Sequence, residues 1–348
     1  MKRLIIITGA YGHLGNTLIK KLIADGEQVR GLVLPGDRSE ALDGCEVELV
    51  RGNICDYNSL EKLFCGLEGR EVIVIHTAGI VTIATKHQEI VRKVNVKGTE
   101  NIIGKCLEHK VKRLIYISSV HAIPEVPGRG LIREIDSFNP ANVRGLYAKT
   151  KSEASQLVLD SIRKGLDAVI IHPSGIIGPQ DYSNGHTTQM FRDYLDGRLT
   201  ALVNGGYDFV DVRDVADGII AAIDRAKCGE SFILSGGYYS VSQLISLLSE
   251  VSGKRRIRTV LPMMFAKMTA PLSELYYKLL RQKPLYTSYS LYTLVSNSNF
   301  SHKKAEAALG FHTRDIRETL KDTVDWLVEN ERVKFKKRSG NVEGCHKK

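Results

Sequence analysis

The sequence predicts an α/β protein in which a doubly wound parallel sheet is followed by a smaller, helix-rich C-terminal part. Short apolar runs rich in β-branched residues alternate with amphipathic helical patterns from residue 3 to residue 173. Such an alternation is typical of a parallel sheet covered by helices on both faces. It loosens after Pro173, where helical patterns outnumber short strands. The remaining chain is therefore expected to make several excursions from the same sheet.

The expected strands of the first half lie at residues 3–8, 28–34, 47–51, 72–77, 112–117 and 168–173, and the helices at 14–25, 58–66, 86–109 and 145–164. The second half is expected to hold helices at 187–197, 211–226, 240–252, 262–282 and 313–329, with short strands at 207–210, 231–234 and 257–260. Right-handed crossovers between parallel strands place a ligand at their carboxyl ends, beside the point where the strand order reverses.

Composition excludes several classes of protein. Six cysteines include no CxxC pair, and no histidine cluster has ligand spacing, so neither a metal site nor a disulfide framework is predicted. The apolar run at residues 4–7 is too short for a signal peptide, and no stretch is long enough to span a membrane. We therefore expect a cytoplasmic protein.

Half of the net charge lies in the C-terminal tail. Residues 334–348 hold six basic residues and one acidic residue, so they carry +5 of the total of +10. A short basic tail is usually a solvated, disordered end. The net positive charge therefore does not indicate a nucleic-acid partner.

A glycine-rich turn follows the first strand. Gly9, Gly12 and Gly15 stand between an apolar run and a helical pattern. Glycines allow a tight turn and a close approach of backbone to a pyrophosphate, whose charge the N–H groups and dipole of a helix start can hold. The alternative is a plain strand-to-helix turn, but the strand before and the helix after favour nucleotide binding.

A YxxxK pattern begins the helix expected at residues 145–164. Tyr147 and Lys151 are four residues apart, so they project from one helix face. A tyrosine with its ordinary pKa near 10 is a poor acid or base at neutral pH, and a nearby lysine charge would lower that pKa. The alternative is a half-buried tyrosine beside a surface lysine.

A pair of serines supports the chemical interpretation. Ser118 and Ser119 end the strand expected at 112–117, and a hydroxyl at the end of a parallel strand points into the ligand cleft. Ser119, Tyr147 and Lys151 together resemble the Ser-Tyr-Lys constellation of the short-chain dehydrogenase/reductase superfamily. Ser119 is preferred to Ser118 because similar families usually carry the catalytic hydroxyl at the second position of such a pair.

Further motifs extend this resemblance from about residue 3 to residue 329. The glycine spacing is GxxGxxG, which is similar to the extended branch of the superfamily, the NAD-dependent epimerase/dehydratase family. The other matching stretches are residues 76–79 (HTAG), 95–101 (NVKGTEN), 172–179 (HPSGIIGP, with His172 in place of the usual arginine), 210–216 (VDVRDVA) and 301–311 with Trp326. In the fourth of these stretches the aspartates are expected to be structural caps.

The resemblance implies a Rossmann fold with three parts. Residues 1–173 would form an NAD(P)-binding domain, and residues 174–330 mainly a substrate-binding part with some elements returning to the sheet. Residues 331–348 would be a basic, disordered tail. Two helices, 86–109 and 145–164, resemble the pair that joins subunits in many relatives, so a homodimer is expected.

The resemblance also implies roles for individual residues. Ser119 would hold the substrate oxygen, Tyr147 would transfer the proton, and Lys151 would hold the nicotinamide ribose. The residues expected to contact the cofactor are Gly9, Tyr11, Gly12, His13, Leu14, Gly15, Asp37, Arg38, Asn53, Ile54, Thr77, Ala78, Gly79, Tyr147, Lys151, Pro173, Ser174, Gly175 and Ile176.

The sequence departs from the family pattern at two places that affect the cofactor prediction. The strand end that should read the ribose 2′ position is Leu34-Pro35, with neither an acid nor an arginine. Asp37 could accept from a 2′-hydroxyl and Arg38 could receive a 2′-phosphate, so both NAD and NADP remain candidates, with NAD favoured because no basic residue occupies the strand end. Asn53 replaces the aspartate that relatives commonly place near the adenine, and its amide can still bind there.

The C-terminal part resembles the dihydroflavonol-reductase and 3β-hydroxysteroid-dehydrogenase branch. The resemblance implies an NAD(P)-dependent dehydrogenase/reductase acting on a secondary alcohol or ketone that is steroid-, flavonoid- or lipid-like. A nucleotide-sugar epimerase/dehydratase is the alternative of the same family, and a non-catalytic NAD(P)-binding sensor or scaffold is another. Residues 261–298 are rich in Met and Tyr, which favours an adaptable apolar substrate pocket; the same run could be an ordinary packed helix pair.

Overall fold

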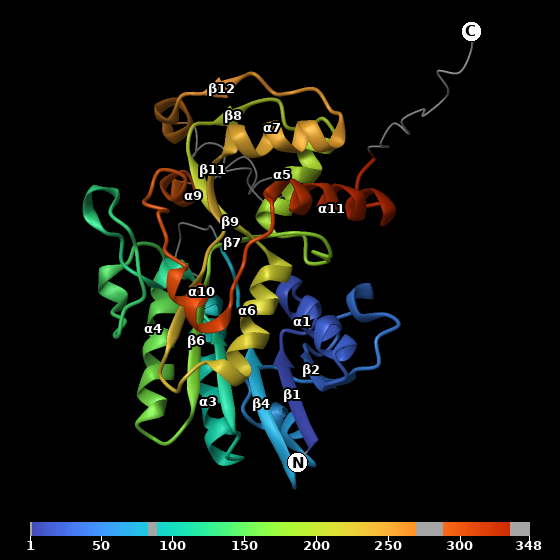
Figure 1. The fold of residues 1–348 in the computed structure, drawn as a ribbon, viewed down its shortest axis with the longest axis vertical. Helices are drawn as coiled ribbons and strands as arrows, with labels where there is room; N and C mark the ends of the chain where they lie inside the picture. The colour runs from blue at the N-terminus through green and yellow to red at the C-terminus, as the bar shows by residue number, and fades with distance from the viewer. Residues whose placement is uncertain (1, 83–88, 269–287, 335–348) are drawn as a thin grey trace.

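The centre of the molecule is a seven-stranded parallel sheet in the order β3-β2-β1-β4-β5-β6-β10 (Figure 1). The computed structural model describes residues 2–82, 89–268 and 288–334. The strands of this sheet are β1 (Lys2–Thr8), β2 (Gln28–Val33), β3 (Glu48–Arg51), β4 (Arg70–His76), β5 (Arg113–Ile117), β6 (Ala168–Pro173) and β10 (Ser231–Leu234). The strand order reverses between β1 and β4, so the crevice expected to hold a ligand opens there.

The strands are buried on both faces because their side chains alternate between two apolar cores. In β1, Ile5 and Ile7 join one core with helices α1 (His13–Ala24) and α6 (Val212–Arg225). Leu4 and Ile6 join the other core with α3 (Thr99–Glu108) and α4 (Leu146–Ile162). The sheet therefore has helices on both faces, which confirms the predicted doubly wound α/β class (Figure 1).

A smaller part lies beyond the carboxyl ends of the strands (Figure 1). It contains a three-stranded sheet, β11-β9-β7, and a two-stranded pair, β12-β8. Apolar residues of its helices form a third core. Its elements are β7 (Gly175–Ile177), α5 (His186–Leu195), β8 (Leu202–Val203), β9 (Gly206–Asp211), β11 (Gly237–Ser240), α7 (Val241–Ser252), β12 (Val260–Leu261), α9 (Ser288–Thr293) and α11 (Ile316–Glu329). Helix α10 (Lys303–Leu309) instead packs against α6 and β10 of the central sheet.

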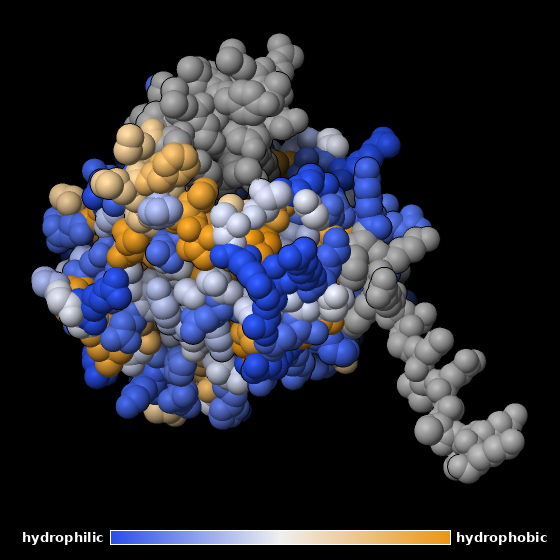
Figure 2. Space-filling view, turned by 90° about the horizontal axis from the view of Figure 1, so that it is seen from above, coloured by the Kyte–Doolittle hydropathy of each residue, from blue (hydrophilic) through white to orange (hydrophobic). Residues whose placement is uncertain are grey.

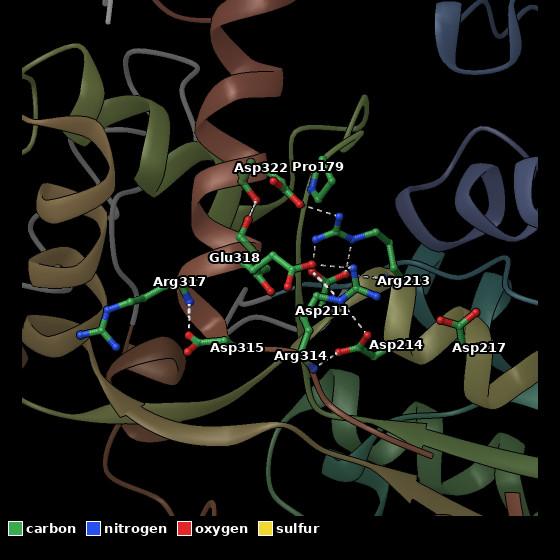
Figure 3. A network of polar contacts seen from close by, with 12 residues as sticks. Pro179, Asp211, Arg213, Asp214, Asp217, Arg314, Asp315, Arg317, Glu318 and Asp322 are labelled. Carbon is green, nitrogen blue, oxygen red and sulfur yellow. Dashed lines mark hydrogen bonds and ion pairs between the residues drawn. The ribbon is translucent and has the colours of Figure 1, made fainter. Parts of the chain in front are cut away.

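A network of ion pairs fastens α11 to α6 (Figure 3). Asp211 caps α6 by accepting from the Arg213 amide, and the Arg213 guanidinium bonds Asp322 of α11 at 2.6 Å. Asp214 accepts from both the backbone N and the Nε of Arg314, at 2.8 and 2.7 Å. Asp211 is thus a helix cap and Asp214 an anchor for the loop before α11, so both aspartates act structurally.

The helix expected at residues 86–109 is divided in the structure. Residues 83–88 lie outside the described part, and α2 (Glu89–Arg92) passes through a π-helical turn, Lys93–Gly98, into α3. Within this turn the Asn95 amide bonds both backbone groups of Ile80, at 2.8 and 3.0 Å. A π turn of this kind re-aims a side chain and is common at functional sites. The turn therefore positions Asn95 beside the chain that follows β4.

Other elements differ in type or length from their predictions. The helix expected at 58–66 is a 3₁₀ helix, Asn58–Phe64, and the strand expected at 257–260 is only Val260–Leu261. Of the helix expected at 262–282, residues 263–268 are helical and residues 269–287 lie outside the described part. Strands β7, β8 and β11 and helices α9 and α10 were not predicted, because runs of two to seven residues show too little periodicity. No helix within the described ranges has the length and apolarity to cross a membrane.

Candidate active site

The glycine turn after β1 is built by close backbone packing. Gly9 has a φ of +73°, which favours glycine, and a Cβ there would lie 3.0 Å from the Ala78 backbone. A Cβ on Gly15 would lie 2.2 Å from the Gly9 carbonyl oxygen. A Cβ on Gly12 would lie 3.1 Å from the same oxygen and meet nothing else within 4 Å. Gly9 and Gly15 are therefore needed for the turn itself, whereas Gly12 has an open side.

The amino end of α1 fits a phosphate group. Gly12 caps the helix without a side-chain hydrogen bond, and the first turn contains no acidic residue. The first N–H groups of a helix have no partner within it, and the helix dipole is positive there. His13 is turned away, since its Nε2 donates to the Pro179 carbonyl at 2.9 Å, and Tyr11 is half-buried against the core. The backbone N–H groups of His13, Leu14 and Gly15 would therefore be the donors to such a phosphate.

A buried histidine fixes the chain that follows β4. His76 Nδ1 lies 2.7 Å from the Thr8 hydroxyl and Nε2 lies 3.1 Å from the Thr99 hydroxyl. Burial lowers the pKa of His76 to about 3, so the ring is neutral. The Ala78 amide donates to the Thr8 hydroxyl, and the Thr77 hydroxyl donates to the Thr8 carbonyl at 2.6 Å. Residues 77–79 are thus held against the glycine turn.

Lys151 lies beside Gly79. A Cβ on Gly79 would lie 3.2 Å from the Asn95 Oδ1 atom and 3.5 Å from the Lys151 Nζ atom. The Lys151 ammonium donates to the Ile117 carbonyl at 2.7 Å and lies 4.9 Å from the centroid of the Tyr116 ring. It is buried with no carboxylate among its described partners, and burial lowers its pKa to about 7. A ribose hydroxyl at Gly79 would find both a cation and an amide oxygen.

The two serines after β5 point to different places. The Ser118 hydroxyl is 2.7 Å from the Ser155 hydroxyl, inside the packing of α4 on the sheet. The Ser119 hydroxyl instead accepts from the His121 amide and lies near the Tyr147 phenol. The side chain of Ser119, unlike that of Ser118, therefore shares a site with Tyr147.

The expected effect of Lys151 on Tyr147 is not seen in this structure. Burial raises the pKa of Tyr147 to about 12, and the nearby Ser119 hydroxyl opposes that rise. Lys151 makes no hydrogen bond to the phenol, because its ammonium is turned toward the Ile117 carbonyl. The helix spacing places both residues on one face, but their tips are engaged by different partners.

His121 and Tyr207 form a pair that the sequence did not single out. The Tyr207 hydroxyl lies 2.9 Å from His121 Nε2, and the His121 ring meets the edge of the Tyr147 ring at a centroid distance of 6.1 Å. Burial lowers the pKa of His121 to about 4 and raises that of Tyr207, so the phenol donates to a neutral imidazole. The sequence could have indicated His121, because it lies two positions after Ser119. It could not have indicated Tyr207, because only the placement of β9 brings that residue to the site.

A cavity of about 370 Å³ lies behind this pair. It is lined by Val120, His121, Ile123, Glu125, Ile132, Ala141, Asn142, Val143, Arg144, Tyr207, Tyr292, Ser296, Asn297 and Phe300. This size suits a small-molecule substrate. The wall mixes apolar groups with amides, hydroxyls and two opposite charges, so it is more polar than the sequence suggested.

The Met- and Tyr-rich stretch contributes to this cavity only in part. Tyr292 lines the cavity, and Tyr289 is buried beside it, at a ring-centroid distance of 6.2 Å. Tyr276, Tyr277 and Tyr286 lie outside the described residues. Met264, Phe265 and Met268 are exposed, and apolar side chains are visible among charged ones on the end of the molecule beyond the strands (Figure 2). The methionines at 264 and 268 therefore do not line the cavity.

The turns after β2 and β3, which would hold the adenosine half of the cofactor, have fewer side chains held in place by packing than the turns described above. Leu34, Asp37 and Arg38 are exposed after β2. The Asn53 side chain caps its own turn by accepting from the Cys55 amide at 2.9 Å. Ile54 is buried, with its carbonyl accepting from Asn101 at 2.8 Å. Only exposed side chains thus stand near the expected 2′ position.

The turn after β6 is tightly held. His172 is buried with its Nδ1 donating to the Ser119 carbonyl at 3.1 Å, and burial lowers its pKa to about 4. It is thus a neutral support for Ser119, where the family pattern has an arginine. The next residues, Pro173, Ser174, Gly175 and Ile176, pass from β6 into β7 at the same end of the sheet.

One surface cluster has the spacing of a metal site. Glu61, Glu108 and His109 bring ligand atoms within 4.8 Å of one another. Both carboxylates pair with Lys105, at 2.5 and 3.1 Å. That cation already neutralises part of their charge, so the cluster is explained as an ion-pair network.

Comparison with known proteins identifies the class to which this site belongs. Residues 5–235 match the model of the NAD dependent epimerase/dehydratase family, and the chain belongs to this family. Its named relatives include a putative dihydroflavonol 4-reductase, a ketoreductase and a 3 beta-hydroxysteroid dehydrogenase/isomerase, and the protein is an enzyme of this NAD-dependent family.

Particular relatives match nearly the whole chain. A sterol demethylase protein B of Methylococcus capsulatus is 29% identical over 328 residues, which cover 93% of this chain and 98% of that protein. A putative dihydroflavonol 4-reductase of Synechocystis is 30% identical over 341 residues, covering 94% and 95%. The crystal structure of gox2253 has a TM-score of 0.82 at 30% identity and covers 96% of this chain and all of its own.

Proposed function

We propose that the protein transfers a hydride between a nicotinamide cofactor and a secondary alcohol or ketone, with Tyr147 moving the proton. The observation that carries this proposal is that the Tyr147 phenol lies beside the Ser119 side chain and the His121 ring, at the carboxyl end of β5 and at the edge of the cavity that His121 lines. The nicotinamide, when bound, supplies or accepts the hydride. Ser119 would orient the substrate oxygen, and Tyr147 would give that oxygen its proton or take it away.

Lys151 would assist the proposed proton transfer by Tyr147. Its ammonium is buried and held by the Ile117 carbonyl, within reach of a ribose placed at Gly79. Binding a ribose hydroxyl would give this cation a further acceptor besides the Ile117 carbonyl and the Tyr116 hydroxyl, and would move it toward the Tyr147 phenol. A closer positive charge would favour the Tyr147 phenolate and lower a pKa that burial has raised.

For the cofactor we propose NAD over NADP, held by the cradle of residues 9–15. The side chains near the expected 2′ position are exposed, and β2 ends at Val33 and is followed by Leu34, so no guanidinium stands at the strand end itself to receive a 2′-phosphate. Asp37 would accept from a 2′-hydroxyl. Calorimetric titration with both dinucleotides tests this proposal, and tighter binding of NADP would contradict it.

The cradle itself can be tested with a matched pair of variants. Gly12 and Gly185 both cap helices with negative φ, and a Cβ on either would have its nearest contact at 3.1 Å. Gly12→Ala should weaken dinucleotide binding at least tenfold, because the methyl group occupies the open side of the turn. Gly185→Ala should leave it unchanged. Equal dinucleotide affinity of the two variants would show that residues 9–15 do not hold the cofactor.

The reaction is tested by following the reduced cofactor at 340 nm. Sterols, dihydroflavonols, simple aldehydes and UDP-sugars cover the branches of the family. We expect turnover with a ketone or secondary alcohol. Cofactor binding without turnover of any of them would favour a sensor or scaffold, and net epimerisation of a UDP-sugar without net oxidation would favour an epimerase.

We also propose that the protein is a homodimer through α3 and α4. The two helices contact each other on one face of the sheet, and α4 carries Tyr147 and Lys151. Light scattering at micromolar concentration should give twice the monomer mass of 38.7 kDa. A monomeric mass would contradict this assembly.

A further inference from the structure

Arg144 is the only arginine or lysine among the described residues that line the cavity. It is exposed at the cavity wall, and within the described part of the chain no carboxylate lies within ion-pairing distance of it. Its guanidinium carbon lies 4.3 Å from the centroid of the Tyr292 ring. A guanidinium presents a planar fork of donors, and stacking on an aromatic face leaves that fork open.

The ring beneath Arg144 is fixed in place. The Tyr292 hydroxyl donates to one oxygen of the Glu125 carboxylate, and the backbone N–H of Asn297 donates to the other oxygen at 3.3 Å. The Asn297 side chain in turn bonds the Val126 and Gly130 carbonyls. Among the described residues, the one carboxylate of the cavity wall is therefore engaged by two donors, whereas the one cation there has no hydrogen-bond acceptor.

Arg144 is also joined closely to the proton-transfer residue. It lies three residues before Tyr147, separated from α4 by Gly145, which has a φ of +100°. A Cβ on Gly145 would lie 2.2 Å from the Tyr289 ring, so α9 packs directly on this glycine. That packing brings Tyr292 under Arg144, and it holds the backbone that carries Arg144 against the start of the helix that carries Tyr147.

We propose that Arg144 binds a carboxylate on the substrate, so that the protein acts on hydroxy or keto acids in which the carboxylate lies away from the reacting carbon. This assignment rests on the proposed oxidoreductase function. A single guanidinium fork matches the two oxygens of a carboxylate. The diphosphate of a sugar nucleotide carries two charges and would need a second cation, and the described cavity wall has only Arg144.

The test compares acids with their neutral esters. The probes are 4-acetylbenzoate and 3-oxo-5β-cholan-24-oate, each with its methyl ester, and UDP-glucose. Binding is measured by calorimetry to the wild-type protein saturated with NAD⁺, which cannot reduce a ketone. At least one acid should bind about tenfold more tightly than its ester, as expected for a charge-assisted pair.

Three variants assign that preference to the guanidinium. Arg144→Gln should reduce the preference for the acid over its ester to less than twofold. Arg144→Lys should retain part of this preference because the charge remains. Arg163→Gln is the control, since that side chain is 86% exposed at the far end of α4. Equal binding of acid and ester in both pairs overturns the proposal. So does a preference that survives Arg144→Gln, or tighter binding of UDP-glucose than of either acid.

The outcome is separable from that of the proposed function. Reduction of ketones without any preference for the acid would remove the Arg144 anchor and leave the oxidoreductase function standing. A preference for the acid that depends on Arg144, found together with no turnover of any ketone, would leave the anchor standing and remove the function.

Discussion

Two buried polar regions of this protein treat charge in opposite ways. In the network between α6 and α11, Arg213 bonds Asp211 and Asp322, and Arg314 bonds Asp214, so each buried charge meets one of opposite sign (Figure 3). In the candidate active site, Lys151 is buried more completely than either arginine, but its partners are a backbone carbonyl and the Tyr116 ring and hydroxyl. The difference separates groups that hold the fold from groups kept available for a ligand.

The pKa directions express the same contrast. Burial lowers the pKa of the Arg213 guanidinium, but hydrogen bonds and charge from Asp211 and Asp322 outweigh burial and raise it overall. Burial also lowers the pKa of Lys151, to about 7, and no carboxylate opposes it. A buried charge with a full set of partners is fixed in one state, whereas one without them titrates near neutral pH.

The largest expected effect is on the rate. Tyr147→Phe removes the hydroxyl that exchanges the proton and leaves the ring packing, so turnover should fall by roughly 10²–10⁴-fold. Cofactor affinity and melting temperature should stay close to those of the wild type. Steady-state kinetics on a substrate found by the screen, with calorimetry for the cofactor, measure this. Near wild-type turnover would show that the Ser-Tyr-Lys interpretation is wrong.

A large loss of stability is expected from the ion-pair network. Asp214→Ala leaves Arg314 without its nearest carboxylate, although Asp211 remains at 3.6 Å. The free energy of unfolding should fall by about 2 kcal/mol, with kcat unchanged. Urea denaturation measures it. Asp217→Ala on the same helix is the control: its side chain is 55% exposed, and its pair with Lys21 should contribute less than about 0.5 kcal/mol.

The unpaired lysine predicts a pH dependence of stability. Above pH 7 the folded protein without cofactor releases the Lys151 proton, whereas the unfolded chain keeps it up to the ordinary pKa of 10.5. The unfolded state then binds more protons, so stability rises with pH. Between pH 7 and 9 this rise should be about 2 kcal/mol.

Lys151→Met should lack that rise while keeping the rest of the pH profile, and urea denaturation at several pH values separates the two curves. Parallel curves for variant and wild type would mean that Lys151 keeps its charge in the folded protein. The same variant should lose turnover and cofactor affinity together, because it removes both the cation and the proposed ribose contact.

The smallest effects are expected from the two serines, and they should differ in kind. Ser119→Ala should lower kcat by roughly 10–100-fold with little change in stability, because its hydroxyl faces Tyr147. Ser118→Ala leaves the Ser155 hydroxyl without this partner and should cost about 1 kcal/mol of stability with kcat unchanged. Kinetics and thermal unfolding of both variants check this, and the opposite pattern would exchange the roles of the two residues.

Local sequence was enough to predict the sheet and the main chemical groups. The strands of the first half differ from their expected bounds by no more than about two residues, because long apolar runs between helical patterns are a strong periodic signal. The short later strands escaped prediction, since β7 and β11 exist only through pairing with β9. The broken helix at 89–108 depends on contacts of Asn95 that lie outside its own segment.

The sequence by itself determined the parallel sheet, the glycine turn and the candidate trio of Ser119, Tyr147 and Lys151, because each depends on spacing within one short segment. The tertiary structure alone decided which partner holds Lys151, and that His121 meets Tyr207 across 86 residues. It also placed the Tyr292 ring under Arg144. Burial and long-range packing set these contacts, and neither property is contained in the local pattern of residues.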